Sequence, residues 1–399
     1  MNHRLETVLH GFIDGTDQSV LAKTFRAFTL LMSIPYSWII RIRNFCYDHG
    51  VFKETHVACK TIAVGNLSLG GVGKTPFIGF LTQLFLEIHY TPGLISRGYK
   101  AKEQKKVFKR EINFSNLVNI DLAKKTGTLN DEAQELALRF PSTPHYLGHD
   151  RIKVANTLLT IHPEIDVLLL DDAFQHRQIA RDLDILLLDA LNPFGGGKVV
   201  PSGFLREPLS SIKRADVILL NRADFIQESE RNNIRSYVSK LAPKAFWGEI
   251  AQVPRDIFTY EFSNVSDEYS RATSISKRKH TDYREWQQTA NSNRFVAFCG
   301  LGAPAGFQKT LSNAKLNIAS FVAFPDHYTY SDRDFVQLQA EATRVNASAF
   351  LVTVKDFVKL EHFAHTSKYP IFALGIGVKF ITGEREFIRL LQTIPTKDN

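Results

Sequence analysis

The sequence predicts an α/β protein with two domains, each built on a mostly parallel sheet. Short apolar runs alternate with amphipathic stretches along most of the chain, as in parallel sheets that are covered by helices. The chain has 399 residues, which is enough for two cores of ordinary size. Its 44% hydrophobic and 23% charged residues are also typical of a globular protein.

The expected strands are short aliphatic segments that alternate with helical patterns. In the first series they are residues 61–64, 93–96, 167–170, 185–188 and 217–220. Helices are expected to start near Thr75 and to span Asp131 to Arg139. In the second series the strands are residues 295–299, 319–323, 350–354 and 371–374. We therefore expect a larger core at 51–262 and a smaller Rossmann-like α/β domain at 294–399.

Two polar regions interrupt this pattern. Residues 263–293 are rich in serine and contain a run of basic residues, so we interpret them as a linker or a poorly ordered insertion. A second basic stretch leads into an insertion at about 100–129, which we expect to be a solvated loop or a loop that contacts an anionic membrane.

Residues 1–50 form a separate N-terminal segment. Its uncharged run from Ala27 to Ile40 contains aromatic residues and is flanked by arginines. The run is shorter than the roughly 20 residues of a spanning helix, and it lacks the cleavage site of a signal peptide. One interpretation is an interfacial helix on an anionic membrane. The other is a helix packed on the protein's own core, with a break at Pro35.

The charge and the cysteines restrict the partners and the compartment. A formal net charge of +8 suits nucleic acid, nucleotide phosphates or an anionic membrane face, and charge alone does not choose among them. The three cysteines are scattered without a CxxC pair, which argues against disulfides or zinc and fits a reducing cytoplasm.

The strongest motif is a glycine-rich turn directly after the strand at 61–64. Such a turn wraps the phosphates of a nucleoside triphosphate with backbone N–H groups at a helix N-terminus. Lys74 would reach the β- and γ-phosphates, and the hydroxyl of Thr75 would bind Mg²⁺. The core therefore has the pattern of a P-loop NTPase-type α/β/α domain. The predicted nucleotide-binding residues are Ser68, Leu69, Gly70, Gly71, Val72, Gly73, Lys74 and Thr75.

Two adjacent carboxylates, Asp171 and Asp172, follow the buried strand at 167–170. Burying two ionised carboxylates costs free energy unless a cation neutralises them. Both are therefore candidate metal ligands. His176 follows four residues after Asp172 and either orients a phosphate or the acceptor, or serves as a capping or core histidine.

Two further motifs are less specific. Asn221-Arg222-Ala223-Asp224 follows a strand and is similar to the NKxD signature with which many P-loop GTPases bind guanine. Arg97 and Tyr99 follow the strand at 93–96, where ligands of open α/β sheets gather.

Taken together, these motifs resemble the tetraacyldisaccharide 4′-kinase family over roughly residues 35–391. The hydroxyl residue Ser68 at the start of the turn is usual in that family. The matching segments are 64–66, 70–76, 96–99, 130–132, 148–151, 171–176, 201–208, 324–328 and 353–356. The chain departs from the family in an N-terminal extension of some twenty residues and in the two polar regions described above.

The resemblance implies two α/β/α domains around a cleft, which the smaller domain closes. It also implies that ATP and Mg²⁺ are used to phosphorylate the 4′-hydroxyl of a tetraacylated glucosamine disaccharide 1-phosphate. The expected location is peripheral, at the cytoplasmic face of the bacterial inner membrane.

The resemblance also implies roles for single residues. Asp131 falls on the catalytic aspartate and His327 on its partner histidine, although from the sequence alone each is more typical of a structural residue. Lys74 and Asp172 complete the expected catalytic set, and Thr75, Asp171 and Asp172 the metal set. The expected substrate contacts are Arg97, Tyr99, Arg151, Gln175, His176, Arg206 and Glu207.

Two other classes of protein remain as alternatives. The Asn221-Arg222-Ala223-Asp224 segment favours a switch GTPase, which would prefer GTP and need no lipid acceptor. The positive charge favours a nucleic-acid-binding ATPase, but the chain lacks the interleaved basic and aromatic patches of such proteins, and no nucleic-acid partner is expected. The sequence does not indicate an oligomeric state.

Overall fold

The structure is a computed structural model that describes residues 11–12, 17–97, 118–119, 131–263, 275–290, 292–302 and 304–393. It divides into two compact units. Unit 1 contains residues 1–130, 140–251 and 379–399, and unit 2 contains residues 131–139 and 252–378. The predicted site residue Tyr99 and most of the insertion at 100–129 lie outside the described residues.

Unit 1 is built on a parallel sheet in which β1 (Lys60–Asn66) lies between β5 (Val167–Asp171) and β6 (Leu183–Asp189). Beyond β5 follow β2 (Pro92–Ser96), β4 (His145–Leu147) and the short antiparallel β3 (Val118–Asn119). Beyond β6 follow β7 (Val217–Asn221) and the first part of β8 (Phe246–Ser263). The central strands are buried on both faces, which explains their continuous aliphatic sequences.

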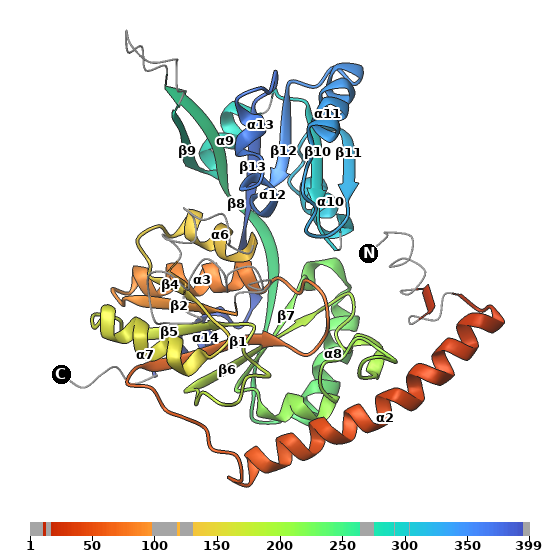
Figure 1. The fold of residues 1–399 in the computed structure, drawn as a ribbon, viewed down its shortest axis with the longest axis vertical. Helices are drawn as coiled ribbons and strands as arrows, with labels where there is room; N and C mark the ends of the chain where they lie inside the picture. The colour runs from red at the N-terminus through yellow and green to blue at the C-terminus, as the bar shows by residue number, and fades with distance from the viewer. Residues whose placement is uncertain are drawn as a thin grey trace, which may run out of the picture. The chain divides into compact units, whose positions relative to one another are not determined.

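Helices cover both faces of this sheet (Figure 1). On one face, α7 (Arg151–Ile161) and α8 (Glu228–Leu241) pack on alternate residues of β5, β6 and β7. On the other face, α3 (Lys74–Glu87) packs on α14 (Glu384–Gln392) through Phe77 and Phe387, whose ring centroids are 6.1 Å apart. The result is the α/β/α layering that the sequence predicts.

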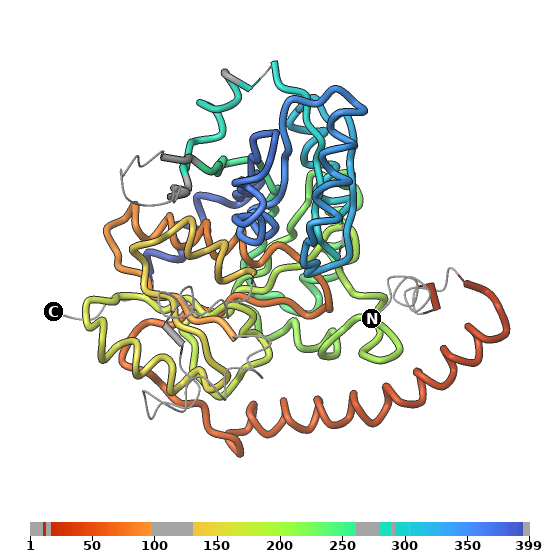
Figure 2. Tube along the Cα trace, turned by 45° about the horizontal axis from the view of Figure 1, so that its top comes forward, coloured from red at the N-terminus to blue at the C-terminus, as the bar shows by residue number. Residues whose placement is uncertain are grey.

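The N-terminal segment of unit 1 forms α2 (Val20–Asp48), a single long helix (Figures 1 and 2). The helix continues through Pro35 without the expected break. Its large apolar side chains are mostly exposed, so the interpretation that they pack on the protein's own core is wrong for them. The exposed ones are Val20, Leu21, Phe28, Leu30, Leu31, Met32, Ile34, Trp38, Ile39, Ile42 and Phe45. Among the described helices, none combines the length and the apolarity needed to cross a bilayer.

Unit 2 contains a second parallel sheet in the order β11 (Ile318–Phe324), β10 (Phe295–Gly300), β12 (Ala349–Thr353) and β13 (Ile371–Thr382). The last part of β8 pairs antiparallel with β9 (Ile275–Asp282). The helices of this unit are α6 (Asp131–Arg139), α9 (Tyr283–Ala290), α10 (Pro304–Asn313), α11 (Asp332–Arg344), α12 (Val354–Phe357) and α13 (Glu361–Ala364).

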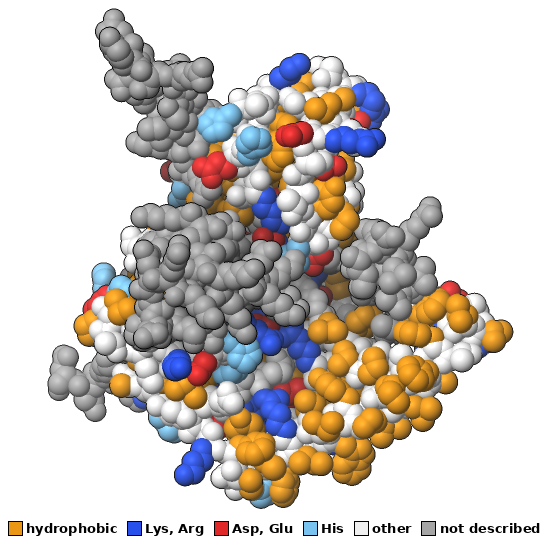
Figure 3. All heavy atoms as spheres, in the orientation of Figure 1, with side chains coloured by type: hydrophobic (Ala, Val, Ile, Leu, Met, Phe, Trp, Pro, Cys, Tyr) orange, Lys and Arg blue, Asp and Glu red, His pale blue; other side chains and the backbone are white. Residues whose placement is uncertain are grey.

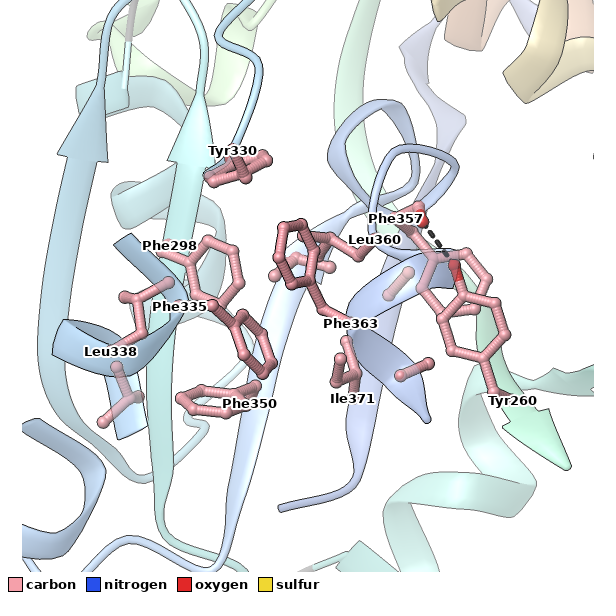
Figure 4. Close-up of a cluster of buried hydrophobic side chains, with 14 of the residues drawn as sticks. Tyr260, Phe298, Tyr330, Phe335, Leu338, Phe350, Phe357, Leu360, Phe363 and Ile371 are labelled. Carbon is pink, nitrogen blue, oxygen red and sulfur yellow. Dashed lines mark hydrogen bonds between the residues drawn. The ribbon is translucent and has the colours of Figure 1, made fainter. Parts of the chain in front are cut away.

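The sheet of unit 2 is also covered on both faces, because successive side chains of a strand point to opposite sides. Val296 and Phe298 of β10 belong to an aromatic cluster beneath α11 and α13 (Figure 4). The alternate residues Ala297 and Cys299 belong to a second cluster on the other face with residues of α9 and α10. Tyr260 of β8 closes the first cluster, and its hydroxyl donates to the carbonyl of Phe357.

All nine predicted strands and both predicted helices are present, with ends that differ by a few residues. The region at 263–293 was expected to be a linker or a poorly ordered insertion, whereas its described part holds β9 and α9. The bounds of the units also differ from the expected domains. Unit 2 begins before residue 263 and includes α6, whereas residues 379–399 belong to unit 1.

Candidate active site

In unit 1, the glycine-rich turn joins β1 to α3 at the carboxyl edge of the sheet. Gly70 and Gly73 adopt positive φ values of 108° and 80°, which side chains other than glycine rarely tolerate. Gly73 directly precedes Lys74, the first residue of α3, so the turn ends at a helix N-terminus. This combination of bare backbone and helix dipole is suited to a phosphate group.

Neighbouring segments hold the turn in place. The buried side chain of Asn221 donates to the carbonyl of Val72 at 2.8 Å. Arg222 donates to the carbonyl of Gly71 at 2.6 Å and forms an ion pair with Asp189 at 2.9 Å. Two residues of the segment that is similar to the guanine-binding signature therefore support the backbone of the phosphate-binding turn.

Asp172 lies between two cations at the end of β5. Its carboxylate is 3.3 Å from Nζ of Lys74 and 2.9 Å from Nη1 of Arg206. Burial on its own would raise the pKa of Asp172, but Lys74 and Arg206 lower that pKa to about 2. Lys74 also donates to Oδ1 of Asn66 at 2.9 Å, so its amine is directed to the strand ends.

Asp171 is the last residue of β5 and is 9% exposed. Oγ of Ser96 lies 3.5 Å from its Oδ2 and 2.9 Å from Nε2 of His145. Arg151 is 1% exposed, and its burial lowers its pKa while the charges of Asp171 and Asp172 counteract that effect. The guanidinium of Arg151 is thus buried close to the acid pair, and its contact with substrate stays a prediction.

The donors near the turn fit a magnesium ion. Thr75 is the second residue of α3, and Asp171 and Asp172 lie at the end of the adjacent strand β5. Hydroxyl and carboxylate oxygens are the ligands that Mg²⁺ prefers, and it usually takes one or two carboxylates together with substrate phosphates. The described residues contain no cluster of three His, Cys, Asp or Glu side chains that could hold a metal without such help.

The segment after the acid pair packs on the turn. Nε2 of Gln175 donates to the carbonyl of Asn66 at 2.8 Å. Burial and the nearby Arg151 lower the pKa of His176 to about 4, so this histidine is neutral at neutral pH. Arg97 is exposed directly after β2.

Glu207, one of the expected substrate contacts, links the core of unit 1 to α2. Its side chain is fully buried, and its carboxylate accepts from Arg214 at 2.8 Å and from Asn44 of α2 at 3.0 Å. Arg43 of the same helix lies 3.7 Å away. Glu207 therefore anchors α2 to the core, and its contact with substrate stays a prediction.

The same helix also contacts residues next to the acid pair. The hydroxyl of Tyr36 donates to the carbonyl of Arg206 at 2.8 Å, and Arg43 donates to the carbonyl of Gln175. At the end of the helix, Arg177 pairs with Asp48 at 2.7 Å. The segments that carry Gln175 and Arg206 are thus bound directly to α2.

In unit 2, the two residues that the resemblance pairs are in contact. Nδ1 of His327 lies 3.0 Å from Oδ2 of Asp131, the first residue of α6. His327 follows β11 with a left-handed φ of 57°, and its N–H donates to the carbonyl of Gly300. Burial would raise the pKa of Asp131, but the hydrogen bonds from His327 and Lys359 lower it, so this carboxylate is ionised at neutral pH.

Sequence reasoning missed the lysines around this pair. Lys359 lies 2.7 Å from Asp131, and Lys355 lies 3.2 Å from Glu132 and 3.4 Å from Asp326. A signal was available, since Lys355 belongs to a segment of the family resemblance and Lys359 follows one helical turn later.

The chain is similar to known proteins over most of its length. Residues 25–395 match the family model described as tetraacyldisaccharide-1-P 4′-kinase. A protein of that name from Syntrophus aciditrophicus is 30% identical over 346 residues, which cover 86% of each chain. One from Halothermothrix orenii is 29% identical over 359 residues, covering 90% of this chain and 89% of the relative.

A solved structure is similar as well. The crystal structure of LpxK from Aquifex aeolicus in complex with ATP is 27% identical, with a TM-score of 0.63. The match covers 92% of this chain and 98% of that one. The predictions of the fold class and of a kinase are thereby confirmed. The chain belongs to the tetraacyldisaccharide-1-P 4′-kinase family.

Proposed function

We propose that this protein transfers the γ-phosphate of ATP to the 4′-hydroxyl of a tetraacylated glucosamine disaccharide 1-phosphate. The observation that carries the proposal is the glycine-rich turn whose Lys74 contacts the strand-end carboxylate Asp172, in a chain of this kinase family. A turn of this kind binds the terminal phosphates of a nucleotide and stabilises charge on the phosphoryl group.

In the proposed reaction, the backbone N–H groups of residues 68–75 bind the phosphates of ATP, and Lys74 offsets charge on the transferring group. Thr75, Asp171 and Asp172 would hold Mg²⁺, which supplies further neutralisation of the phosphate charge when bound. Arg206 restrains the carboxylate of Asp172 through its contact of 2.9 Å. Arg97 is the proposed substrate contact in unit 1.

Asp131 is the proposed general base. A sugar hydroxyl is a weak acid, so a carboxylate that takes its proton during transfer assists the attack. The proton moves to Asp131 as the hydroxyl oxygen bonds to the γ-phosphorus and the bond from that phosphorus to the bridging oxygen of ADP breaks. The hydrogen bond with His327 orients the carboxylate for this role.

The proposed location is the cytoplasmic face of the inner membrane, with α2 bound peripherally. Figure 3 shows hydrophobic side chains gathered over α2, and the exposed Arg41 lies on the same helix. An apolar helix face with cations is suited to the headgroup region of an anionic bilayer. The lipid substrate could then keep its acyl chains in the membrane.

The test is incubation of the purified protein with ATP, Mg²⁺ and the disaccharide 1-phosphate lipid in detergent, followed by mass spectrometry. We expect one added phosphate, located by fragmentation on the non-reducing sugar. A Lys60→Ala variant serves as a matched control, because Lys60 lies in unit 1 in a surface ion pair with Asp182. Absence of product with ATP, or equal turnover without the lipid, contradicts the proposed function.

A further inference from the structure

In unit 2, two side chains hold the same oxygen of Asp131. Nζ of Lys359 lies 2.7 Å and Nδ1 of His327 lies 3.0 Å from Oδ2 of that carboxylate. The side chains of Lys359 and Asp131 are each 15% exposed, so water screens this ion pair much less than a surface pair. The second oxygen, Oδ1, takes part in neither contact.

Lys359 also contacts the loop that carries the histidine. Its Nζ donates to the carbonyl of Tyr328 at 3.2 Å, and Tyr328 is the residue after His327. One ammonium group therefore joins the start of α6, which provides Asp131, to the loop after β11, which provides His327.

The backbone that carries Lys359 is firmly held. Its N–H donates to the carbonyl of Asp356 at 2.9 Å. The fully buried carboxylate of Asp356 in turn accepts from Gly300, Tyr330 and Thr353 at 2.6–3.1 Å. Lys359 thus extends from a rigid turn, as a group that positions another side chain should.

The other charges near Asp131 have separate partners. Lys355 of α12 pairs with Glu132 of α6 and with Asp326 of the loop after β11. The phenol of Tyr330 is engaged with Asp356 at 2.9 Å. The ionised state of Asp131 therefore depends on His327 and Lys359 as its direct partners, with Lys355 acting at longer range.

We propose that Lys359 is a positioning residue for phosphoryl transfer, which fixes Oδ2 of Asp131 to the His327 loop and leaves Oδ1 to accept the proton of the acceptor hydroxyl. This inference rests on the proposed function, in which Asp131 is the base. Placing a catalytic group about 1 Å from its working position costs roughly 100-fold in rate, so a tether of this kind has a measurable effect.

The test compares Lys359→Met, Lys359→Gln and Lys359→Arg with the exposed-site control Lys368→Met of the same unit. We expect Lys359→Met and Lys359→Gln to lower kcat by about 10- to 100-fold without changing KM for ATP. They should also move the acidic limb of kcat/KM to higher pH, because loss of the ammonium raises the pKa of Asp131 and its active form is the carboxylate. Lys359→Arg keeps the positive charge, so the acidic limb of its kcat/KM profile should lie at the same pH as in wild type.

An Asp131→Asn variant in the same series separates the two claims. Wild-type turnover in Asp131→Asn would overturn the proposed base itself. An inactive Asp131→Asn together with wild-type kcat and an unmoved acidic limb in Lys359→Gln and Lys359→Met would overturn the role of Lys359 alone. Equal upward shifts of the limb in Lys359→Arg and Lys359→Met would also overturn it, because charge would then be irrelevant.

Discussion

Left-handed backbone conformations occur at three residues of the two candidate sites that are not glycine. Asp172, Arg222 and His327 have φ values of 49°, 59° and 57°. Such conformations cost energy for these residue types and persist where the surrounding contacts determine them. Each of the three side chains is held by the contacts described above. These contacts maintain the left-handed backbone at Asp172, Arg222 and His327.

A substitution of Asn221 tests directly whether the support of the phosphate-binding turn matters for ATP binding. Its Nδ2 is buried and donates to the carbonyl of Val72. An Asn221→Ala variant loses this hydrogen bond, whose net value is about 0.5–1.5 kcal/mol, and the turn becomes less well ordered. We expect KM for ATP to rise up to about tenfold with a smaller change in kcat.

The measurement is steady-state kinetics with varied ATP, and Asn232→Ala is the matched control. Asn232 is exposed on α8 in the same unit. The supporting role of Asn221 is refuted if both variants show the wild-type KM for ATP. A change from ATP to GTP preference in Asn221→Ala would instead assign this residue to base recognition.

At the scale of elements, α2 joins the core through a buried carboxylate. Glu207→Gln leaves Arg214, whose side chain is 8% exposed, without its charged partner. Breaking a buried ion pair in this way costs about 3–5 kcal/mol, so we expect a clearly lower melting temperature. Asp182→Asn, which removes a surface ion pair with Lys60, should change the melting temperature little.

The same carboxylate predicts how stability depends on pH. Burial would raise the pKa of Glu207, but Arg214 and Asn44 lower it below its ordinary value of 4.5. The ionised carboxylate of Glu207 therefore adds to the free energy of unfolding at pH values above its pKa in the unfolded chain. This contribution is lost as the pH falls through its lower pKa in the folded protein. Melting temperatures measured in that acidic range should fall less steeply for Glu207→Gln than for wild type, and parallel curves would contradict the assignment.

The apolar face of α2 makes a separate prediction about membrane binding. Leu31 and Ile39 are 61% and 63% exposed. Burying such a side chain in lipid contributes about 1.5–3 kcal/mol, so Leu31→Glu combined with Ile39→Glu should abolish binding to anionic vesicles. Turnover of detergent-dispersed substrate should stay near wild type, because neither side chain belongs to the proposed catalytic set.

Vesicle flotation measures this effect, and Leu191→Glu is its control. Leu191 is 54% exposed in unit 1 but lies outside α2. Retained flotation of the α2 double variant, or equal loss in Leu191→Glu, would remove the support for α2 as the membrane contact.

For the whole molecule, the sequence predicts the strands well because most of their aliphatic runs are buried on both faces. It predicts β9 poorly, since this strand is polar and its pattern is typical of a loop. The two compact units have other bounds than the expected domains, because α6 joins unit 2 and α14 joins unit 1 across long stretches of chain. Local periodicity carries no information on such distant contacts.

In the candidate sites, too, the sequence predicts what local motifs determine and does not predict what depends on distant contacts. Lys74, Thr75 and the acid pair come from one local motif at strand ends, so spacing alone identifies them. The contact of Asp131 with His327 joins residues nearly two hundred positions apart, and only the family resemblance indicates it. The burial of Arg151 and Glu207 depends on packing between distant segments, so the sequence pattern does not predict it.

The central claim is that Lys74 and Asp131 act in one phosphoryl transfer from ATP to the lipid disaccharide. Single-turnover rates for wild type, Lys74→Ala and Asp131→Asn, with ATP saturating and the fold verified by melting temperature, test it most directly. We predict that each variant transfers phosphate at least about 100-fold more slowly than wild type. A near wild-type rate in either variant would contradict the account.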